Sequence, residues 1–96
     1  MPLEDDFHRA MIRIAERARD ECRYDPRRFV QMISEYGASE TARRLLHSDQ
    51  VPDGFLFLLE SGRTDLSMEK LILEEKWTPL FTEEERRIAR RRLGME

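Results

Sequence analysis

The chain has 96 residues, of which 40% are hydrophobic and 39% are charged, and its formal net charge is −3. This length fits one domain, and the hydrophobic content excludes a disordered chain, so we expect residues 1–96 to form a single globular domain. Cys22, the one cysteine, cannot form an internal disulfide, which favours a reducing compartment. The longest apolar run, Phe55 to Leu59, is far below the roughly 20 residues that cross a bilayer, and the first residues lack the pattern of a signal peptide. We therefore expect a cytoplasmic protein that does not enter a membrane.

The first part of the chain predicts two helices. Residues 3–22 carry apolar side chains at steps of three and four, which is the pattern of an amphipathic helix: Phe7, Ala10, Met11, Ile14, Ala18 and Cys22. A second helix is expected over residues 26–36. Asp25 precedes it as an N-cap, and Gly37 is expected to end it in the left-handed conformation.

Two shorter helices are expected next. Ser39 is expected to cap a third helix that ends near His47. Asp53 is expected to cap a fourth helix over residues 54–61, and Gly62 is expected to end it. This fourth helix is apolar nearly all round, so it lies either at the centre of the fold or beneath a partner.

The last third of the chain adds two more helices. Ser67 is expected to be the N-cap of a helix that runs to about residue 76. Thr82 with Glu85 three residues later forms a capping box, which predicts the start of a C-terminal helix that Gly94 ends. Because no segment alternates apolar and polar residues over four or more positions, the sequence predicts an all-α, compact bundle of five or six short helices.

No motif for catalysis, metal binding or cofactor binding is present in the sequence. His8, His47 and Cys22 are the only soft metal ligands, and they do not have the spacing of a metal site. The chain also lacks a phosphate-binding loop, a nucleophile elbow and a dinucleotide-binding glycine motif. We therefore expect no catalytic residue, no metal and no cofactor. An enzyme whose active site carries no recognisable motif is the least favoured alternative.

The favoured hypothesis is a non-catalytic module that binds another protein. Residues 77–81 place large apolar side chains around a proline in a segment that cannot be helical throughout. Such side chains either close the core, which is favoured in a small domain, or contact a partner. Arg63 and Asp65 take no part in the expected helix boundaries, which leaves them free for ion pairing or for contact with something else. The oligomeric state stays open, and the candidate interface residues are Phe57, Arg63, Asp65, Trp77, Leu80 and Phe81.

The alternative hypothesis is a nucleic-acid-binding accessory protein. Arg86, Arg87, Arg90 and Arg91 stack as two adjacent rows on the C-terminal helix and could contact phosphates. The net negative charge and the glutamates at residues 83–85 weigh against this function, because those glutamates can instead pair with the arginines.

Four blocks of sequence between residues 25 and 93 follow one another in a specific order: YGASETARRLL at 36–46, DGF at 53–55, GRTDLSME at 62–69 and PLFTEEE at 79–85. In this order and spacing the chain resembles a group of small bacterial proteins and domain segments of unassigned function. The resemblance supplies no catalytic residue. It implies an accessory role in a larger, multi-component bacterial system. Thr64 departs from the pattern, which has an aliphatic residue at that position.

Overall fold

A computed structural model describes residues 2–96, and Met1 lies outside this range. Over the described residues the chain forms six α-helices and two 3-10 helices and contains no strand: α1 (Leu3–Cys22), α2 (Arg27–Tyr36), α3 (Ala38–Leu46), α4 (Asp53–Glu60), η1 (Thr64–Leu66), α5 (Met68–Ile72), η2 (Glu75–Leu80) and α6 (Glu83–Arg92). The predicted all-α bundle is therefore confirmed. None of the helices between residues 2 and 96 has the length and apolar content needed to cross a bilayer.

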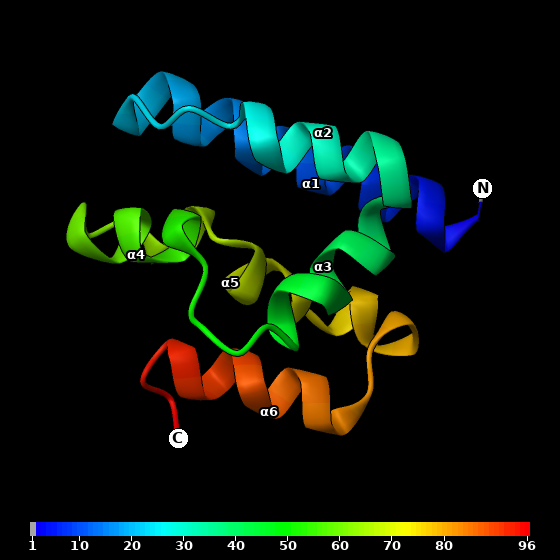
Figure 1. Ribbon diagram of the computed structural model, residues 1–96. Helices are drawn as coiled ribbons and strands as arrows, with labels where there is room; N and C mark the ends of the chain where they lie inside the picture. Colours follow the sequence, from blue (N-terminus) through cyan, green and yellow to red (C-terminus); the bar gives the residue numbers. More distant parts are fainter. Residues whose placement is uncertain (1) are drawn as a thin grey trace.

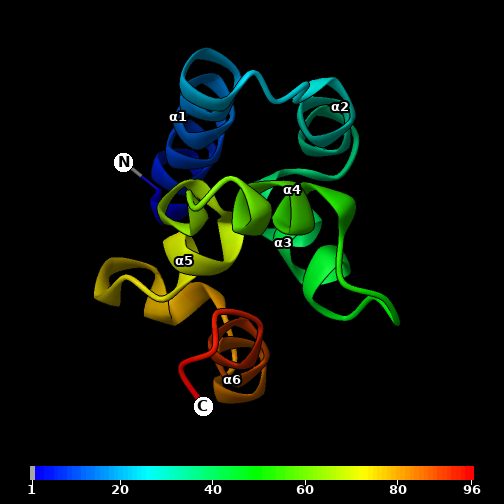
Figure 2. The ribbon, with the colours of Figure 1, turned by 90° about the vertical axis from the view of Figure 1, so that its left-hand side faces the viewer.

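The helices are arranged in three tiers. Figure 1 shows α1 and α2 side by side in the upper tier, α3, α4 and α5 in the middle, and α6 below them. The view turned by 90° keeps the same order (Figure 2). Residue contacts join α3 both to the helices of the upper tier and to α6, so α3 connects the top of the molecule to the bottom.

Phe7 of α1 lies at the centre of the core and is fully buried. Its ring contacts Trp77 and Phe81 edge-on, at centroid distances of 5.2 and 5.3 Å. Trp77 and Phe81 are themselves only 3% and 6% exposed. The segment around Pro79 therefore closes the core, which is the use that the sequence favours for a small domain.

The remaining core residues come from five of the six α-helices, all except α4. They surround Phe7 in one continuous cluster: Met11, Ile33, Ala38, Ala42, Leu46, Met68, Leu71, Ile72 and Ala89. A second, smaller cluster joins Ala18 of α1 to Leu58 and Leu66. α4 thus packs on the end of α1, away from the main core.

The caps of α5 and α6 are confirmed. The Lys70 N–H donates to the hydroxyl oxygen of Ser67 over 3.1 Å. The Glu85 N–H donates to the Thr82 hydroxyl oxygen over 3.1 Å, and the Thr82 N–H donates to Glu85 Oε1 over 2.9 Å. Both arms of the predicted capping box are therefore present.

The predicted cap of α3 is wrong. Ser39 lies inside α3, and its N–H and hydroxyl both donate to Glu4 Oε1 of α1, over 3.0 and 2.8 Å. Gly37 takes the cap position of both α2 and α3, with φ 87° and ψ 163°. The positive φ agrees with the prediction, but the ψ is extended, a combination essentially restricted to glycine. A single residue therefore separates the two helices.

Three other predicted boundaries also differ. Asp25 and Asp53 are not N-caps: prolines hold those positions, and Asp53 is the first residue of α4. The helix expected over residues 67–76 ends at Ile72 and is followed by the 3-10 helix η2. The extended backbone of Glu74 breaks the helical hydrogen bonding between them, and Trp77 then enters the core. Burial of this large ring outweighs local helix propensity.

Candidate interaction surfaces

α4 presents an exposed apolar surface. The helix buries Phe55 and Leu58, while Leu56, Phe57 and Leu59 remain 41%, 38% and 49% exposed. We call these three exposed residues the α4 face. Five consecutive apolar residues on a helix point in all directions, so one neighbouring helix cannot cover them all. α4 is therefore neither central to the fold nor fully covered within this chain.

Tyr24, which follows α1, packs against α4. Its ring lies 5.4 Å from the ring of Phe57, centroid to centroid, and burial raises the pKa of its hydroxyl. A Cβ atom at Gly54 would lie only 2.6 Å from the Tyr24 hydroxyl oxygen. The close approach of α4 to Tyr24 thus depends on glycine at this position.

Arg63 and Asp65 form ion pairs, which is one of the two uses that the sequence leaves open for them. Arg63 Nε donates to Asp65 Oδ1 over 3.0 Å, and Arg63 Nη2 donates to Glu21 Oε1 over 2.7 Å. The Arg63 hydrogen bond lowers the pKa of Asp65. These residues connect the end of α1 to the segment after α4, so their charges are engaged within the chain.

The six predicted interface residues therefore have different surroundings. Phe57 belongs to the α4 face, whereas Trp77 and Phe81 are buried in the core. Leu80 is half-buried beside the core, and its carbonyl oxygen accepts a hydrogen bond from Arg43 Nη1 over 3.0 Å. Leu56 and Leu59 were not among the six. Leu56 and Leu59 lie three residues apart, and the buried residues Phe55 and Leu58 have the same spacing one position earlier. This pattern is the signal in the sequence that identifies Leu56 and Leu59.

Two of the four candidate phosphate-binding arginines are engaged in ion pairs. Arg86 pairs with Glu83 on the preceding turn of α6. Arg90 Nη2 donates to Glu83 Oε1 and Arg90 Nε to Glu96 Oε2, each over 2.7 Å. Hydrogen bonds from the two arginines lower the pKa of Glu83. The glutamate pairing that weighs against phosphate contact is therefore present for these two residues.

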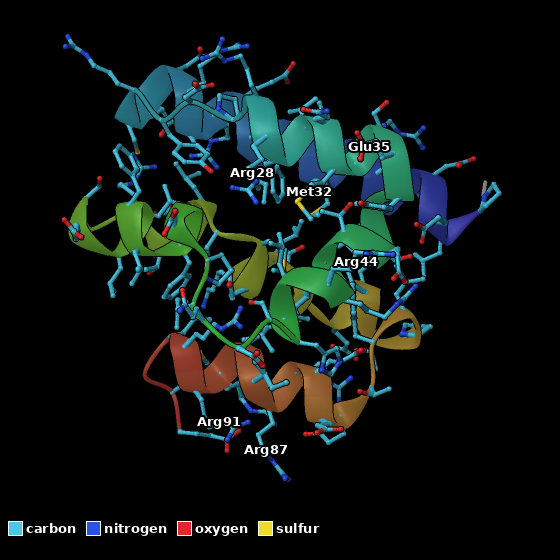
Figure 3. The ribbon with its side chains drawn as sticks, viewed as in Figure 1. Arg28, Met32, Glu35, Arg44, Arg87 and Arg91 are labelled. Atoms are coloured by element: carbon cyan, nitrogen blue, oxygen red, sulfur yellow. The ribbon has the colours of Figure 1, made fainter. Side chains whose placement is uncertain are left out.

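The other two arginines are free or nearly free. Arg87 Nε lies 3.9 Å from Glu96 Oε1, a weak contact, and Arg91 makes no ion pair within the part of the chain that the structure describes. Figure 3 shows both side chains projecting from α6 away from the body of the molecule. They lie one turn apart on the same side of the helix.

Arg92, the third arginine of the terminal run, is buried. Its side chain is 9% exposed, and Nη1 donates to Oε2 of Glu69, which is 3% exposed, over 2.9 Å. Arg92 Nη2 also donates to the Leu46 carbonyl oxygen over 3.0 Å. Burial raises the pKa of Glu69, while the hydrogen bond from Arg92 opposes that rise. The ion pair connects α6 to α5, and the hydrogen bond to Leu46 connects α6 to the end of α3.

The structure contains no cluster typical of a metal centre in residues 2–96: no three His, Cys, Asp or Glu side chains are arranged to hold an ion. His8 and Cys22 lie 14 positions apart on α1, which is about 21 Å along a helix. His47 Nε2 lies 2.9 Å from Glu85 Oε2, so its ring is engaged with α6.

Comparisons of the chain with protein-family models, with curated proteins and with solved structures found no match.

Proposed function

We propose that the protein is a non-catalytic interaction or accessory module that binds another protein through the α4 face. The observation that carries this proposal is the exposure of three large apolar side chains on one eight-residue helix. Exposed apolar groups that lie next to one another are typical of protein-binding surfaces, whereas single ones are common on any protein.

The composition of α4 agrees with this role. Its charged residues, Asp53 and Glu60, lie at its two ends, and the positions between them carry no charge. Interfaces have the same arrangement, with an apolar centre that lacks charged groups and a polar rim. Phe57 is the aromatic residue of the α4 face, and aromatic side chains often contribute most to binding.

The test removes the apolar groups without disturbing the core. The double variant Leu56→Ser, Leu59→Ser is expected to lower affinity for the partner at least about tenfold, because apolar area is lost at the centre of the interface. The partner would be captured from native cells with the wild-type chain, purified, and titrated with each variant by calorimetry. Stability should change little, since both residues are exposed.

A matched control tests whether any exposed apolar residue has this effect. Val30 and Tyr36 of α2 are 37% and 42% exposed, and the double variant Val30→Ser, Tyr36→Ser is expected to bind like the wild type. Equal affinity of the α4 variant and the wild type would refute the proposal, and so would turnover of a substrate by the purified protein.

Nucleic-acid binding is the second candidate function, and the free side chains of Arg87 and Arg91 favour it. Two phosphate contacts predict an affinity for duplex DNA that falls with a log–log salt slope of about −2. Arg87→Glu with Arg91→Glu should abolish this binding in a fluorescence anisotropy titration. Arg13→Glu with Arg23→Glu, at exposed positions of α1 and just after it, is the matched control. Unchanged affinity after reversal of Arg87 and Arg91 would exclude this function.

A further inference from the structure

A cavity of about 580 Å³ lies between α1 and α2 on one side and α4 with its preceding loop on the other. Its floor consists of buried apolar side chains from three parts of the chain: Ala15, Ala18, Phe55, Leu58, Leu66 and Met68. The volume falls within the range of small-molecule sites, which are also mostly apolar with a few polar groups. The cavity uses the inward side of α4, opposite the exposed α4 face.

The charged residues at the rim differ in whether they already have partners. Asp25 accepts hydrogen bonds from Arg27 on both carboxylate oxygens, at 3.0 and 2.7 Å. Arg44 Nε lies 3.2 Å from Glu40 Oε2. These two rim charges are therefore largely neutralised by neighbours of the same chain.

Arg28 is the rim cation without such a partner, since it makes no ion pair between residues 2 and 96. Figure 3 shows Arg28 and Met32 pointing from α2 toward the middle of the molecule, and both line the cavity. Asp53, the remaining rim carboxylate, makes no ion pair between residues 2 and 96 either, but it is the first residue of α4, where the N–H groups of the helix stabilise a negative charge. The rim therefore leaves a guanidinium free to pair with an anion.

Glu69 also lines the cavity, but it does not require a cation from a ligand. Its carboxylate already accepts a hydrogen bond from Arg92 over 2.9 Å. The buried polar residues of the lining, Ser67 and Glu69, thus both have hydrogen-bonding partners within the chain, whereas the exposed Arg28 has no ion-pair partner.

We propose that this cavity binds a small amphipathic carboxylate, with its acyl or aryl body on the apolar floor and its carboxylate paired with Arg28. The planar guanidinium matches a carboxylate in a two-bond geometry, and such charge-assisted bonds are stronger than neutral ones. This ligand class goes beyond the proposed function, because it uses a different side of α4.

Titration of the protein with decanoate, below its micelle concentration, tests the proposal. We expect saturable binding of one decanoate per chain, seen by calorimetry and by NMR shifts of the Ala18 and Met32 methyl groups. Arg28→Ala should weaken this binding about tenfold. Arg13→Ala, at an exposed arginine that lies outside the cavity and pairs with none of its rim residues, should leave it unchanged.

Two further measurements keep the result independent of any single variant. On the wild-type protein, decylammonium should bind at least about tenfold more weakly than decanoate, because Arg28 has no anionic partner whereas the N-terminus of α4 already stabilises the Asp53 carboxylate. Met32→Trp should weaken the binding of decanoate while leaving the unfolding transition in place, since the larger ring takes up space in the cavity one helical turn from Arg28. The absence of saturable binding, equal binding of decylammonium, equal effects of Arg28→Ala and Arg13→Ala, or full binding by a folded Met32→Trp variant would each overturn the proposal.

Discussion

Replacing Arg92 with methionine is expected to lower the free energy of unfolding by about 3 kcal/mol or more. The substitution removes the guanidinium that pairs with the Glu69 carboxylate, which then remains buried beneath α6 with no cation beside it. It also removes the donor to the Leu46 carbonyl oxygen. Urea unfolding followed by far-UV circular dichroism measures the loss.

Arg91→Met is the matched control, because Arg91 is the adjacent, exposed arginine. It should change stability by less than about 0.5 kcal/mol. The double variant Arg92→Met, Glu69→Met should regain most of the stability lost by the single one, since two packed apolar side chains replace the pair. If Arg92→Met is as stable as Arg91→Met, or the double variant is no better than the single, the ion pair does not have this role.

The deficit of Arg92→Met should also depend on pH. Burial raises the pKa of Glu69, a backbone hydrogen bond and Arg92 both oppose this rise, and loss of Arg92 removes one of these two interactions. A carboxyl whose folded pKa is raised contributes stability below its unfolded pKa and loses that contribution as pH rises through the folded pKa. The difference between Arg92→Met and the wild type should therefore be smaller at about pH 4 than at about pH 7.

Phe7→Ala is the second substitution with a large expected effect, about 3–5 kcal/mol of unfolding free energy. Phe7 is fully buried, and its ring provides the contact surface for Trp77 and Phe81. Alanine would leave a cavity at the point where the first helix meets η2. Phe7→Leu keeps more of the apolar volume and should cost about 1.5 kcal/mol or less.

Trp77 is the only tryptophan, so its fluorescence reports this contact directly. In both Phe7 variants the change in Trp77 emission and the loss of helix signal should occur in one transition. A separate, earlier emission change in the wild type would show that η2 is not part of the cooperative core. An equal cost for Phe7→Ala and Phe7→Leu would contradict the cavity argument.

The fold was predictable from the sequence where its signals are local. Thr82 and Glu85 lie three residues apart, and both bonds of their capping box form within one turn. Ser39 shows the opposite case, because its partner Glu4 lies 35 residues earlier in the chain. A serine before a short helix has the same local pattern whether it caps that helix or bonds to a distant one, so only tertiary structure separates the two outcomes.

The candidate surfaces were predictable to a smaller extent. The sequence indicates that α4 is too apolar to be an ordinary surface helix, but which of its side chains remain exposed depends on where α1 and η1 pack. Among the terminal arginines, Arg90 and Arg91 are indistinguishable in sequence, yet the first is engaged by Glu83 and Glu96. Arg92 and Glu69 lie 23 residues apart, and no local pattern indicates that two charged residues will be buried together.

The single residue between α2 and α3 has a consequence for access to the cavity. Gly37 joins the two helices with no intervening loop, and α2 and α3 pack against each other, so helix packing holds the wall that contains Met32 and Leu45. The opposite wall, from Ser48 to Pro52, has no regular hydrogen-bonded helix to hold it. We expect this segment to be the entrance, and amide hydrogen exchange should be faster there than in α2 or α3. We therefore expect the segment from Ser48 to Pro52 to move more than the wall formed by α2 and α3. Binding of decanoate should slow amide hydrogen exchange in that segment.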